Sequence, residues 1–351
     1  MNRTPTRVAI PTLVRIKPGA LARSGIYLNR FDHRSVVVFQ SVGLPKSIIE
    51  ALRAALSDSK IDVVSLNEVN DNSFDRAVDT FRKLNGQPTA VIGVGGGKAL
   101  DVAKYVAFLS KLPYFAIPTS LSNDGFCSPQ SSLMIEGKRR SLAATMPFGV
   151  IVDTRVCAQS PPNLSLSGVG DLASKFTAIH DWKLSFHNTG EAVDDFAALL
   201  SDGSVHAFMA RPTLDEAGLR LLATSLMMNG IAMEVCGSSR PASGSEHLIS
   251  HALDLLSARP RLHGLQVGVA AYWMSLLHHE NSSSISELFV ETGFWDIIAE
   301  DRFYMSEWLE AVNLAPSIKP GYFTVLSLPD SRAEAEDILR NDSLMQECFV
   351  A

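Results

Sequence analysis

The sequence has no uninterrupted apolar run of the roughly 18–20 residues that a membrane-spanning helix needs. Its N-terminal segment, MNRTPTRVAIPTLVRIKPGA, is basic but is broken by prolines and lacks the apolar core of a secretory signal. Cysteine is scarce, and the four cysteines are far apart and form no CxxC pair, which favours reduced thiols over a disulfide scaffold or a cysteine–zinc site. We therefore expect a cytoplasmic protein without membrane insertion.

Excess positive charge is also lacking. The formal net charge is −6, and no block of Lys and Arg is interleaved with aromatic residues, so nucleic acid is not an expected partner. The chain has 351 residues, of which 46% are hydrophobic and 19% charged. This length and composition are typical of a globular protein with two domains.

The first half alternates between β-branched runs and helical patterns. Expected strands lie at 35–39, 61–66, 89–95, 114–118 and 149–153, and expected helices at 45–56, 73–84 and after residue 97. Such alternation predicts a parallel sheet covered by helices on both faces, that is, a Rossmann-like α/β domain.

The second half has a different character. The stretch QSPPNLSLSG, residues 159–168, is rich in Pro and Ser and indicates a boundary. Beyond it the sequence shows long helical patterns and almost no strand, with Asp171 near the expected start of the first helix. We therefore predict an α/β domain over residues 1–160 and an all-α domain over residues 161–351.

Three adjacent glycines interrupt the pattern in GVGGGKALDVAKYVA, residues 93–107. A glycine-rich turn from a strand into a helix presents backbone N–H groups at the positive end of the helix dipole, where a phosphate binds well. The spacing matches neither GxxxxGK[ST] nor GxGxxG. The stretch alone therefore fits both a phosphate cradle and a tight packing turn.

A second polar stretch, IPTSLSNDGFCSPQSS (residues 117–132), begins at the carboxyl end of an expected strand, where open α/β sheets bind ligands. It can equally be a polar surface loop.

The second half contains a candidate set of metal ligands. His247 and His251 are spaced i,i+4 on one helical face, and His263 and Asp171 are the other two members of the set. Imidazoles with a carboxylate are common ligands of zinc, iron and nickel, although capping or core histidines give the same pattern.

Taken together, these segments resemble the superfamily of iron-containing alcohol dehydrogenases, glycerol dehydrogenases and dehydroquinate synthases. The similarity covers roughly residues 90–275 and is greatest to the sn-glycerol-1-phosphate dehydrogenase branch. PTSLSNDGF and SGSEHLISHALD are specific to that branch, whereas the glycine run is shared across the superfamily. The resemblance implies a dehydroquinate synthase-like fold, NAD(H) or NADP(H), and one divalent ion, Zn²⁺, Ni²⁺ or Fe²⁺.

Roles for individual residues follow from the resemblance. The metal ligands would be Asp171, His247 and His263, whereas His251 would face the substrate. The substrate would also contact Asp124, Asp171 and Lys175, with Asp171, His251 and Asp124 as catalytic residues. The cofactor would be bound by Gly95, Gly96, Gly97, Lys98, Asp101, Thr119, Ser120, Ser122 and Ser128.

The implied reaction is hydride transfer between the nicotinamide and dihydroxyacetone phosphate, in a cleft between the two domains. The metal would act as a Lewis acid on the carbonyl oxygen, and His251 would relay the proton, since histidine ordinarily titrates near neutral pH. Donors for the substrate phosphate would be Lys175 and the segment 138–140, KRR, which also fits an exposed hairpin. We further expect a homo-oligomer.

The sequence departs from the branch in two places. Leu265 replaces the usual carboxylate beside His263, which would remove a hydrogen-bonding partner near the metal, and Cys127 replaces a smaller residue. The first strand ends in Gln40 and Ser41 without an acid, so NADP(H) is not excluded. Three alternatives stay open: a dehydrogenase of another polyol or keto phosphate, a sugar-phosphate cyclase of the dehydroquinate synthase type, and a binding module without activity.

Overall fold

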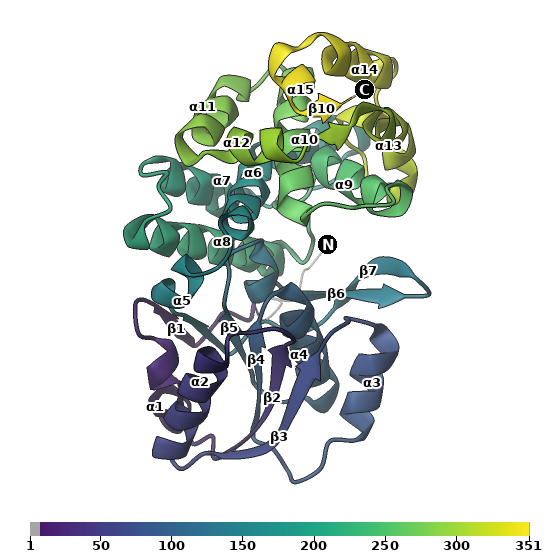
Figure 1. Cartoon of the computed structure of the whole chain (residues 1–351). Helices are drawn as coiled ribbons and strands as arrows, with labels where there is room; N and C mark the ends of the chain where they lie inside the picture. The colour runs from purple at the N-terminus through teal and green to yellow at the C-terminus, as the bar shows by residue number, and fades with distance from the viewer. Residues whose placement is uncertain (1–7, 351) are drawn as a thin grey trace. The chain divides into compact units, whose positions relative to one another are not determined.

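A computed structural model of the chain describes residues 8–350, which fall into two compact units (Figure 1). The first unit consists of the described residues up to Ser120 together with Gly125–Ser160. The second consists of Leu121–Asp124 and the described residues from Pro161 onward. The short segment Leu121–Asp124 thus belongs to the second unit although the chain on either side of it belongs to the first.

The first unit is built on a six-stranded sheet with the order β1-β8-β5-β4-β2-β3, in which every neighbouring pair is parallel. Its strands are β1 (Leu13–Ile16), β2 (Ser35–Ser41), β3 (Asp62–Val69), β4 (Ala90–Gly95), β5 (Tyr114–Pro118) and β8 (Gly149–Val152). A separate antiparallel hairpin is formed by β6 (Gln130–Ile135) and β7 (Lys138–Ala143). The α/β prediction is confirmed, while β1, which lies between two prolines, was not predicted.

Both faces of this sheet are covered. The helical elements are η1 (Leu21–Arg23), α1 (Ser24–Asn29), α2 (Lys46–Asp58), α3 (Phe74–Arg82), α4 (Gly97–Ser110) and α5 (Thr154–Ala158), with the turn η2 (Asp124–Cys127). Along β2, Val38 packs in one core cluster with Leu52 of α2, while Phe39 packs in the other with Val102 of α4. Burial on both sides explains the continuous apolar run of this strand.

The order of the strands creates a switch point between β2 and β4. From β2 the chain passes to β3 on one side of it, and then returns to β4 on the other side. In open sheets of this type, the carboxyl ends of the two strands at the switch flank the ligand crevice. Here those ends carry Ser41 and the glycine turn.

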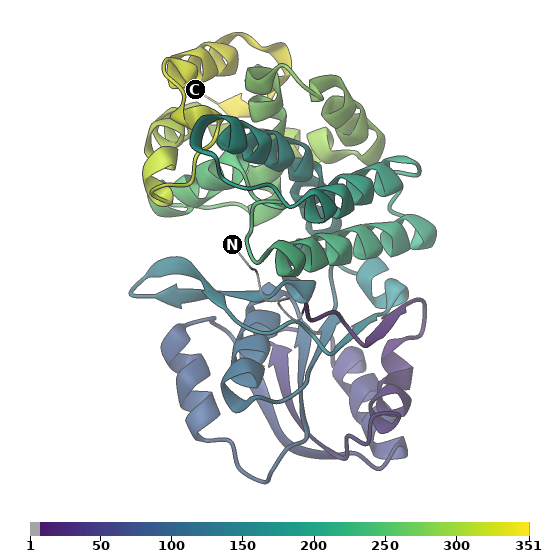
Figure 2. The same ribbon diagram turned by 180° about the vertical axis from the view of Figure 1, so that it is seen from behind.

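The second unit is helical (Figure 2). Its helices are α6 (Pro162–Thr189), α7 (Asp195–Met209), α8 (Glu216–Cys236), α9 (Ser245–Leu256), α10 (His263–His278), α11 (Ser282–Thr292), α12 (Phe294–Glu300), α13 (Met305–Ile318), α14 (Ser331–Asn341) and α15 (Ser343–Glu347), with the short turn η3 (Val325–Ser327). Two strands of two residues each, β9 (Phe303–Tyr304) and β10 (Phe349–Val350), pair in parallel. The all-helical prediction therefore holds apart from this small pair.

One expectation about this half was wrong. α6 begins at Pro162, inside the stretch 159–168, where proline's fixed φ and missing N–H suit the first helical turn. As a result, Asp171 lies well inside α6 rather than near its start.

Within the described residues, one helix, α8, is long and apolar enough to cross a membrane by length and composition. More than half of its most apolar 18-residue segment is buried inside the protein.

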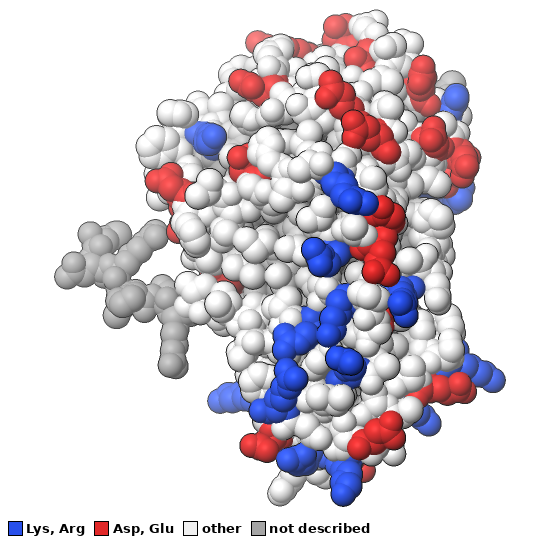
Figure 3. All heavy atoms as spheres, turned by 90° about the vertical axis from the view of Figure 1, so that its left-hand side faces the viewer, with Lys and Arg blue, Asp and Glu red and all other residues white. Residues whose placement is uncertain are grey.

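Charge is distributed unevenly along the chain. Lys and Arg outnumber Asp and Glu in the residues of the first unit, whereas Asp and Glu predominate in those of the second. The face drawn in Figure 3 displays this difference as a group of basic side chains on the first unit and mostly acidic ones on the second. The first unit thus offers the more favourable field for an anionic ligand.

Candidate functional site

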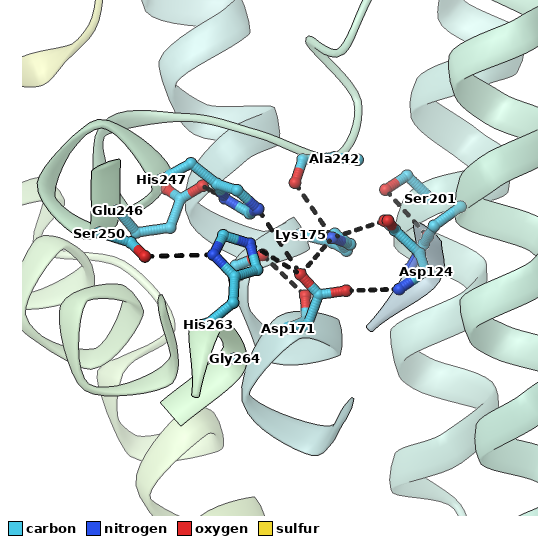
Figure 4. A network of polar contacts seen from close by, with 12 residues as sticks. Asp124, Asp171, Lys175, Ser201, Ala242, Glu246, His247, Ser250, His263 and Gly264 are labelled. Carbon is cyan, nitrogen blue, oxygen red and sulfur yellow. Dashed lines mark hydrogen bonds and ion pairs between the residues drawn. The ribbon is translucent and has the colours of Figure 1, made fainter. Parts of the chain in front are cut away.

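Three helices of the second unit bring a carboxylate and two imidazoles together (Figure 4). Asp171 comes from α6, His247 from α9 and His263 from α10. The Nε2 atoms of His247 and His263 lie 3.5 and 3.9 Å from Asp171 Oδ1, and the three ligand atoms all lie within 4.8 Å of one another. This set of donors can hold a divalent metal ion and leave coordination positions for other ligands.

Glycines let the backbones of α6 and α10 approach closely enough to form this cluster. A Cβ added to Gly170 would lie 2.1 Å from the carbonyl oxygen of Gly264, and one added to Gly264 would lie 1.8 Å from that of Ser167. The hydroxyl of Ser167 accepts a hydrogen bond from Gly264 N at 3.1 Å and donates one to the Ser122 carbonyl at 2.9 Å. Asp171 follows directly after Gly170 and so faces the start of α10.

Each imidazole is oriented through its other nitrogen. His247 Nδ1 lies 2.8 Å from Glu246 Oε1, and His263 Nδ1 lies 3.2 Å from Ser250 Oγ. Both contacts leave the Nε2 atoms directed toward Asp171. Partners of this kind fix the tautomer and the ring orientation of a metal-binding histidine.

Glu246 was not predicted from the sequence. Its side chain is fully buried and also accepts hydrogen bonds from Gly244 N at 2.6 Å and Thr177 Oγ1 at 2.7 Å. Consecutive helical residues do not normally face each other, so Glu246 gave no spacing signal. The contact arises in the first turn of α9, where Glu246 bends back to the N-cap residue.

The departure at Leu265 does not leave a histidine without a partner. Leu265 is buried in α10, and Ser250 takes the position beside His263 Nδ1. Ser250 also accepts a hydrogen bond from Gln266 Nε2 at 3.0 Å. Although Leu265 supplies no carboxylate, His263 Nδ1 therefore has a hydrogen-bonding partner, the neutral hydroxyl of Ser250.

Lys175 lies one turn after Asp171 and is completely buried. Its Nζ is 3.1 Å from Asp124 Oδ2, 3.6 Å from Asp171 Oδ1 and 3.0 Å from the carbonyl oxygen of Ala242. Asp124 N also donates to Asp171 Oδ2 at 2.9 Å. The ammonium has three donors and three acceptors around it, so it neutralises the two carboxylates rather than pointing toward a free anion site.

The electrostatics follow from these contacts. Burial tends to raise the pKa of Asp171, but Lys175 and the two histidines outweigh it and hold this pKa well below its usual range. Burial and the charge of Asp171 raise the pKa of Asp124, against the opposing effect of Lys175. Burial tends to lower the pKa of His247, yet Asp171 and Glu246 raise it overall. Asp171 is thus the carboxylate that stays ionised and available to a cation.

His251 lies beside this cluster without being part of it. Its ring stacks on that of His263, with centroids 5.9 Å apart, and its Nδ1 is 4.0 Å from Asp254 Oδ2. The side chain is 33% exposed, compared with 10% for His247. It can therefore exchange protons with solvent more readily than the buried imidazole of His247.

The glycine turn of the first unit lies between β4 and α4. Gly95 has φ +132°, a region that favours glycine, and a Cβ there would lie 2.2 Å from Ser41 Oγ. Ser41 Oγ accepts a hydrogen bond from Gly96 N at 3.0 Å, and Thr119 N donates to Gly95 O at 3.1 Å. From the sequence, Ser41 was notable only because it stands where an acid could bind the ribose, and its role in the turn was not predicted.

The next two glycines border open space. A Cβ on Gly96 or Gly97 would have no atom within 4 Å, and Gly96, the N-cap of α4, makes no side-chain cap. Lys98 is exposed in the first turn of the helix. Backbone N–H groups at an uncapped helix start with room in front of them suit a phosphate.

Asp101 and Ser128 take part in contacts that hold the loop after β5. The buried ammonium of Lys104 donates to the carbonyl oxygens of Gly125 and Gln130 and to Ser128 Oγ, and lies 4.0 Å from Asp101. Burial raises the pKa of Asp101 to about 6, partly offset by Lys104. These contacts stabilise the loop that follows β5.

The remaining predicted residues are divided between the units. Thr119 and Ser120 are buried at the end of β5 in the first unit, whereas Ser122 belongs to the second, where its carbonyl accepts from Ser167. The basic segment 138–140 lies on the exposed strand β7 of the hairpin.

Comparisons with known proteins place the chain in a family. The profile of the iron-containing alcohol dehydrogenases matches residues 15–161. The glycerol-1-phosphate dehydrogenase [NAD(P)+] of Metallosphaera sedula is 32% identical over 97% of this chain and 98% of its own. That of Methanothermobacter thermautotrophicus is 34% identical over 92% and 94% of the two chains.

Solved structures show the same fold. Glycerol dehydrogenase from Schizosaccharomyces pombe superposes with a TM-score of 0.78 at 17% identity, over 98% of this chain and 92% of that one. An iron-containing alcohol dehydrogenase from Thermotoga maritima gives 0.70 at 18% identity, over 98% and 99%. With relatives matched over nearly their whole length, the chain belongs to the glycerol-1-phosphate dehydrogenase family of the iron-containing alcohol dehydrogenases.

Proposed function

We propose that the protein is a metal-dependent NAD(P)-linked dehydrogenase that reduces dihydroxyacetone phosphate to sn-glycerol 1-phosphate. The observation that carries the proposal is the cluster of Asp171, His247 and His263, two of them buried and His263 partly so, in a chain whose full-length relatives are named for this activity. The fold alone would not distinguish among the many activities that one scaffold supports.

The cluster fits a divalent ion by its chemistry. One ionised carboxylate and two imidazoles with oriented Nε2 atoms are a ligand set that Zn²⁺, Ni²⁺ and Fe²⁺ all accept. A bound ion would supply Lewis acidity to the substrate carbonyl, and a bound nicotinamide would supply the hydride. Asp171 would hold the ion, while Glu246 and Ser250 keep the imidazoles in place.

The glycine turn fits the cofactor pyrophosphate. The open space before Gly96 and Gly97 and the uncapped start of α4 support binding of this group, with Gly95 shaping the turn and Lys98 adding charge. Thr119, Ser120 and Ser122 remain the proposed contacts to the nicotinamide nucleotide. Asp101 and Ser128, both in contact with the ammonium of Lys104, would support the loop after β5 that lies beside the cofactor.

The chain's own residues would bind the substrate and move the proton. Asp124 is 15% exposed and held by Lys175, so its carboxylate would accept a hydrogen bond from a substrate hydroxyl. Lys175 would act by positioning Asp124, since its donors are already used. His251, on the solvent side of His263, would give the proton to the developing alkoxide through a hydroxyl or a water.

His251→Asn is expected to lower kcat/KM by about 10²–10⁴-fold, the usual contribution of a general acid, without loss of metal. The pH–rate profile should lose the limb that reports this proton transfer. The matched control is His279→Asn, because His279 is 78% exposed and pairs only with Glu334 in the described contacts. Metal loss in His251→Asn, or activity equal to the control, would contradict this role.

The proposed function is tested by NAD(P)H oxidation with purified protein, stripped of metal and then reconstituted with Zn²⁺, Ni²⁺ or Fe²⁺. We expect turnover of dihydroxyacetone phosphate only after reconstitution, and little turnover of unphosphorylated dihydroxyacetone. Turnover of another polyol or keto phosphate alone would move the enzyme to a different substrate. Tightly bound NAD with no net use of free cofactor would favour a sugar-phosphate cyclase, and no turnover with any metal would refute the proposal.

Two further properties belong to the same proposal. We expect a homo-oligomer, a dimer or larger, in a cytoplasmic enzyme with a small phosphorylated substrate and no nucleic-acid partner. Light scattering coupled to size exclusion measures the assembly directly. A strictly monomeric active enzyme would overturn that part alone.

A further inference from the structure

The carboxyl ends of β2 and β3 carry a polar pair beside the glycine turn. Gln40 lies opposite Val94 of β4 on one side and opposite Glu68 of β3 on the other. The next residue, Ser41, accepts the hydrogen bond from Gly96 N. Gln40 therefore lies at the switch point, on the strand next to the turn that would hold the pyrophosphate, and Glu68 lies one strand further away.

The amide of Gln40 has a fixed orientation. It is buried, and its Nε2 donates to Glu68 Oε1 at 2.9 Å, so the nitrogen must face the carboxylate, which only accepts. Gln40 Oε1 is buried and has no hydrogen-bond partner. The acceptor that a ligand can reach is therefore the second oxygen of the exposed Glu68 carboxylate, which Gln40 holds in place.

The cation in contact with this part of β3 is already engaged. The guanidinium of Arg76 donates to Asn70 Oδ1 at 2.6 Å, to Asp71 Oδ2 at 3.1 Å and to the backbone carbonyl of Glu68. Arg76 is thus paired with Asp71 and not with the carboxylate of Glu68. Hydrogen bonds from Ser73 and the nearby Arg76 hold the pKa of Asp71 below its usual range, so Asp71 stays ionised.

Building on the proposed function, we propose that Gln40 and Glu68 select NAD(H) over NADP(H). In sheets of this class an acid at the end of the strand next to the glycine turn accepts hydrogen bonds from the adenosine ribose and excludes a 2′-phosphate. Here β2 has an amide, and the acid is displaced to β3 and tied back by Gln40. The exposed carboxylate of Glu68 suits the ribose hydroxyls as an acceptor, and its negative charge opposes the phosphate dianion.

Binding of each reduced nucleotide to the full-length enzyme, followed by NAD(P)H fluorescence without substrate, tests this selection. We expect NADPH to bind at least about tenfold more weakly than NADH, equivalent to about 1.4 kcal/mol. Glu68→Gln keeps the shape but removes the charge, and should bring the ratio close to one by improving NADPH binding. Added salt should narrow the ratio in the wild type but not in the variant.

Two other variants complete the test. Asp62→Asn is the matched control, since Asp62 is an exposed acid at the opposite end of β3, and its ratio should equal that of the wild type. Gln40→Leu should weaken NADH binding several-fold by releasing the Glu68 carboxylate. Equal wild-type affinity for both nucleotides, or an unchanged ratio in Glu68→Gln, would overturn the inference alone. Binding of neither nucleotide would overturn the proposed function together with it.

Discussion

Asp171→Asn is expected to lower kcat/KM by at least about 10³-fold, or about 4 kcal/mol of transition-state stabilisation, and to lose the divalent metal. The reason is that Asp171 is the only carboxylate in the ligand cluster and is held ionised by Lys175 and the histidines. An asparagine oxygen is a weak ligand beside two neutral imidazoles. Metal content, measured after dialysis, and the turnover assay report the two losses together.

The fold should survive this substitution. Asn can still accept the hydrogen bond from Asp124 N, and Lys175 keeps its ion pair with Asp124. Asp202→Asn, at an exposed position on α7, is the matched control and should retain metal and activity. Glu246→Gln should give an intermediate result, with metal affinity about 10–100-fold weaker, because it weakens the contact that orients His247 but leaves all three ligand side chains in place. Asp171→Asn with full metal content and activity within tenfold of the wild type would contradict the metal site.

Much of the first unit could be predicted from sequence because its signals are local. The apolar runs of β2, β4 and β5 are buried on both faces, and each is followed by a loop or helix that the pattern marks clearly. β1 was missed because it has only four residues, one of them the basic Arg15, and becomes a strand through pairing with β8. A partner more than a hundred residues away gives no local signal.

The functional cluster was harder to predict because it depends on packing. The i,i+4 spacing of His247 and His251 suggested that both bind the metal, and only the family resemblance favoured His263 over His251. In the structure, the close approach of α6 and α10 at Gly170 and Gly264 brings His263 beside Asp171. The full burial of Lys175 between two carboxylates likewise could not be read from its position in an otherwise ordinary helix.

Lys175→Met is expected to lower the free energy of unfolding of the metal-free protein by about 3–5 kcal/mol, the usual result of leaving buried charge without its partner. The methionine fills a similar volume, so the loss comes from electrostatics rather than from a cavity. Asp124 and Asp171 would face each other with no ammonium between them, and the Ala242 carbonyl would lose its donor. Metal is removed first because a bound cation would replace part of the missing charge and stabilise the folded state.

The effect of Lys175→Met should depend on pH in a direction that identifies its cause. In the wild type, the lowered pKa of Asp171 contributes stability that is present above its ordinary value of 3.8 and is lost as the pH falls toward the lowered value. In the variant the unpaired carboxylates have raised pKa values, so acidification neutralises them and recovers stability. Denaturant unfolding with EDTA should therefore show that the difference in free energy of unfolding between wild type and variant shrinks from pH 7 to pH 5.

Lys183→Met, at an exposed position on the same helix, is the control and should change the free energy of unfolding by less than about 0.5 kcal/mol. A gap that is small at pH 7, or that does not change with pH, would show that Lys175 does not neutralise this site.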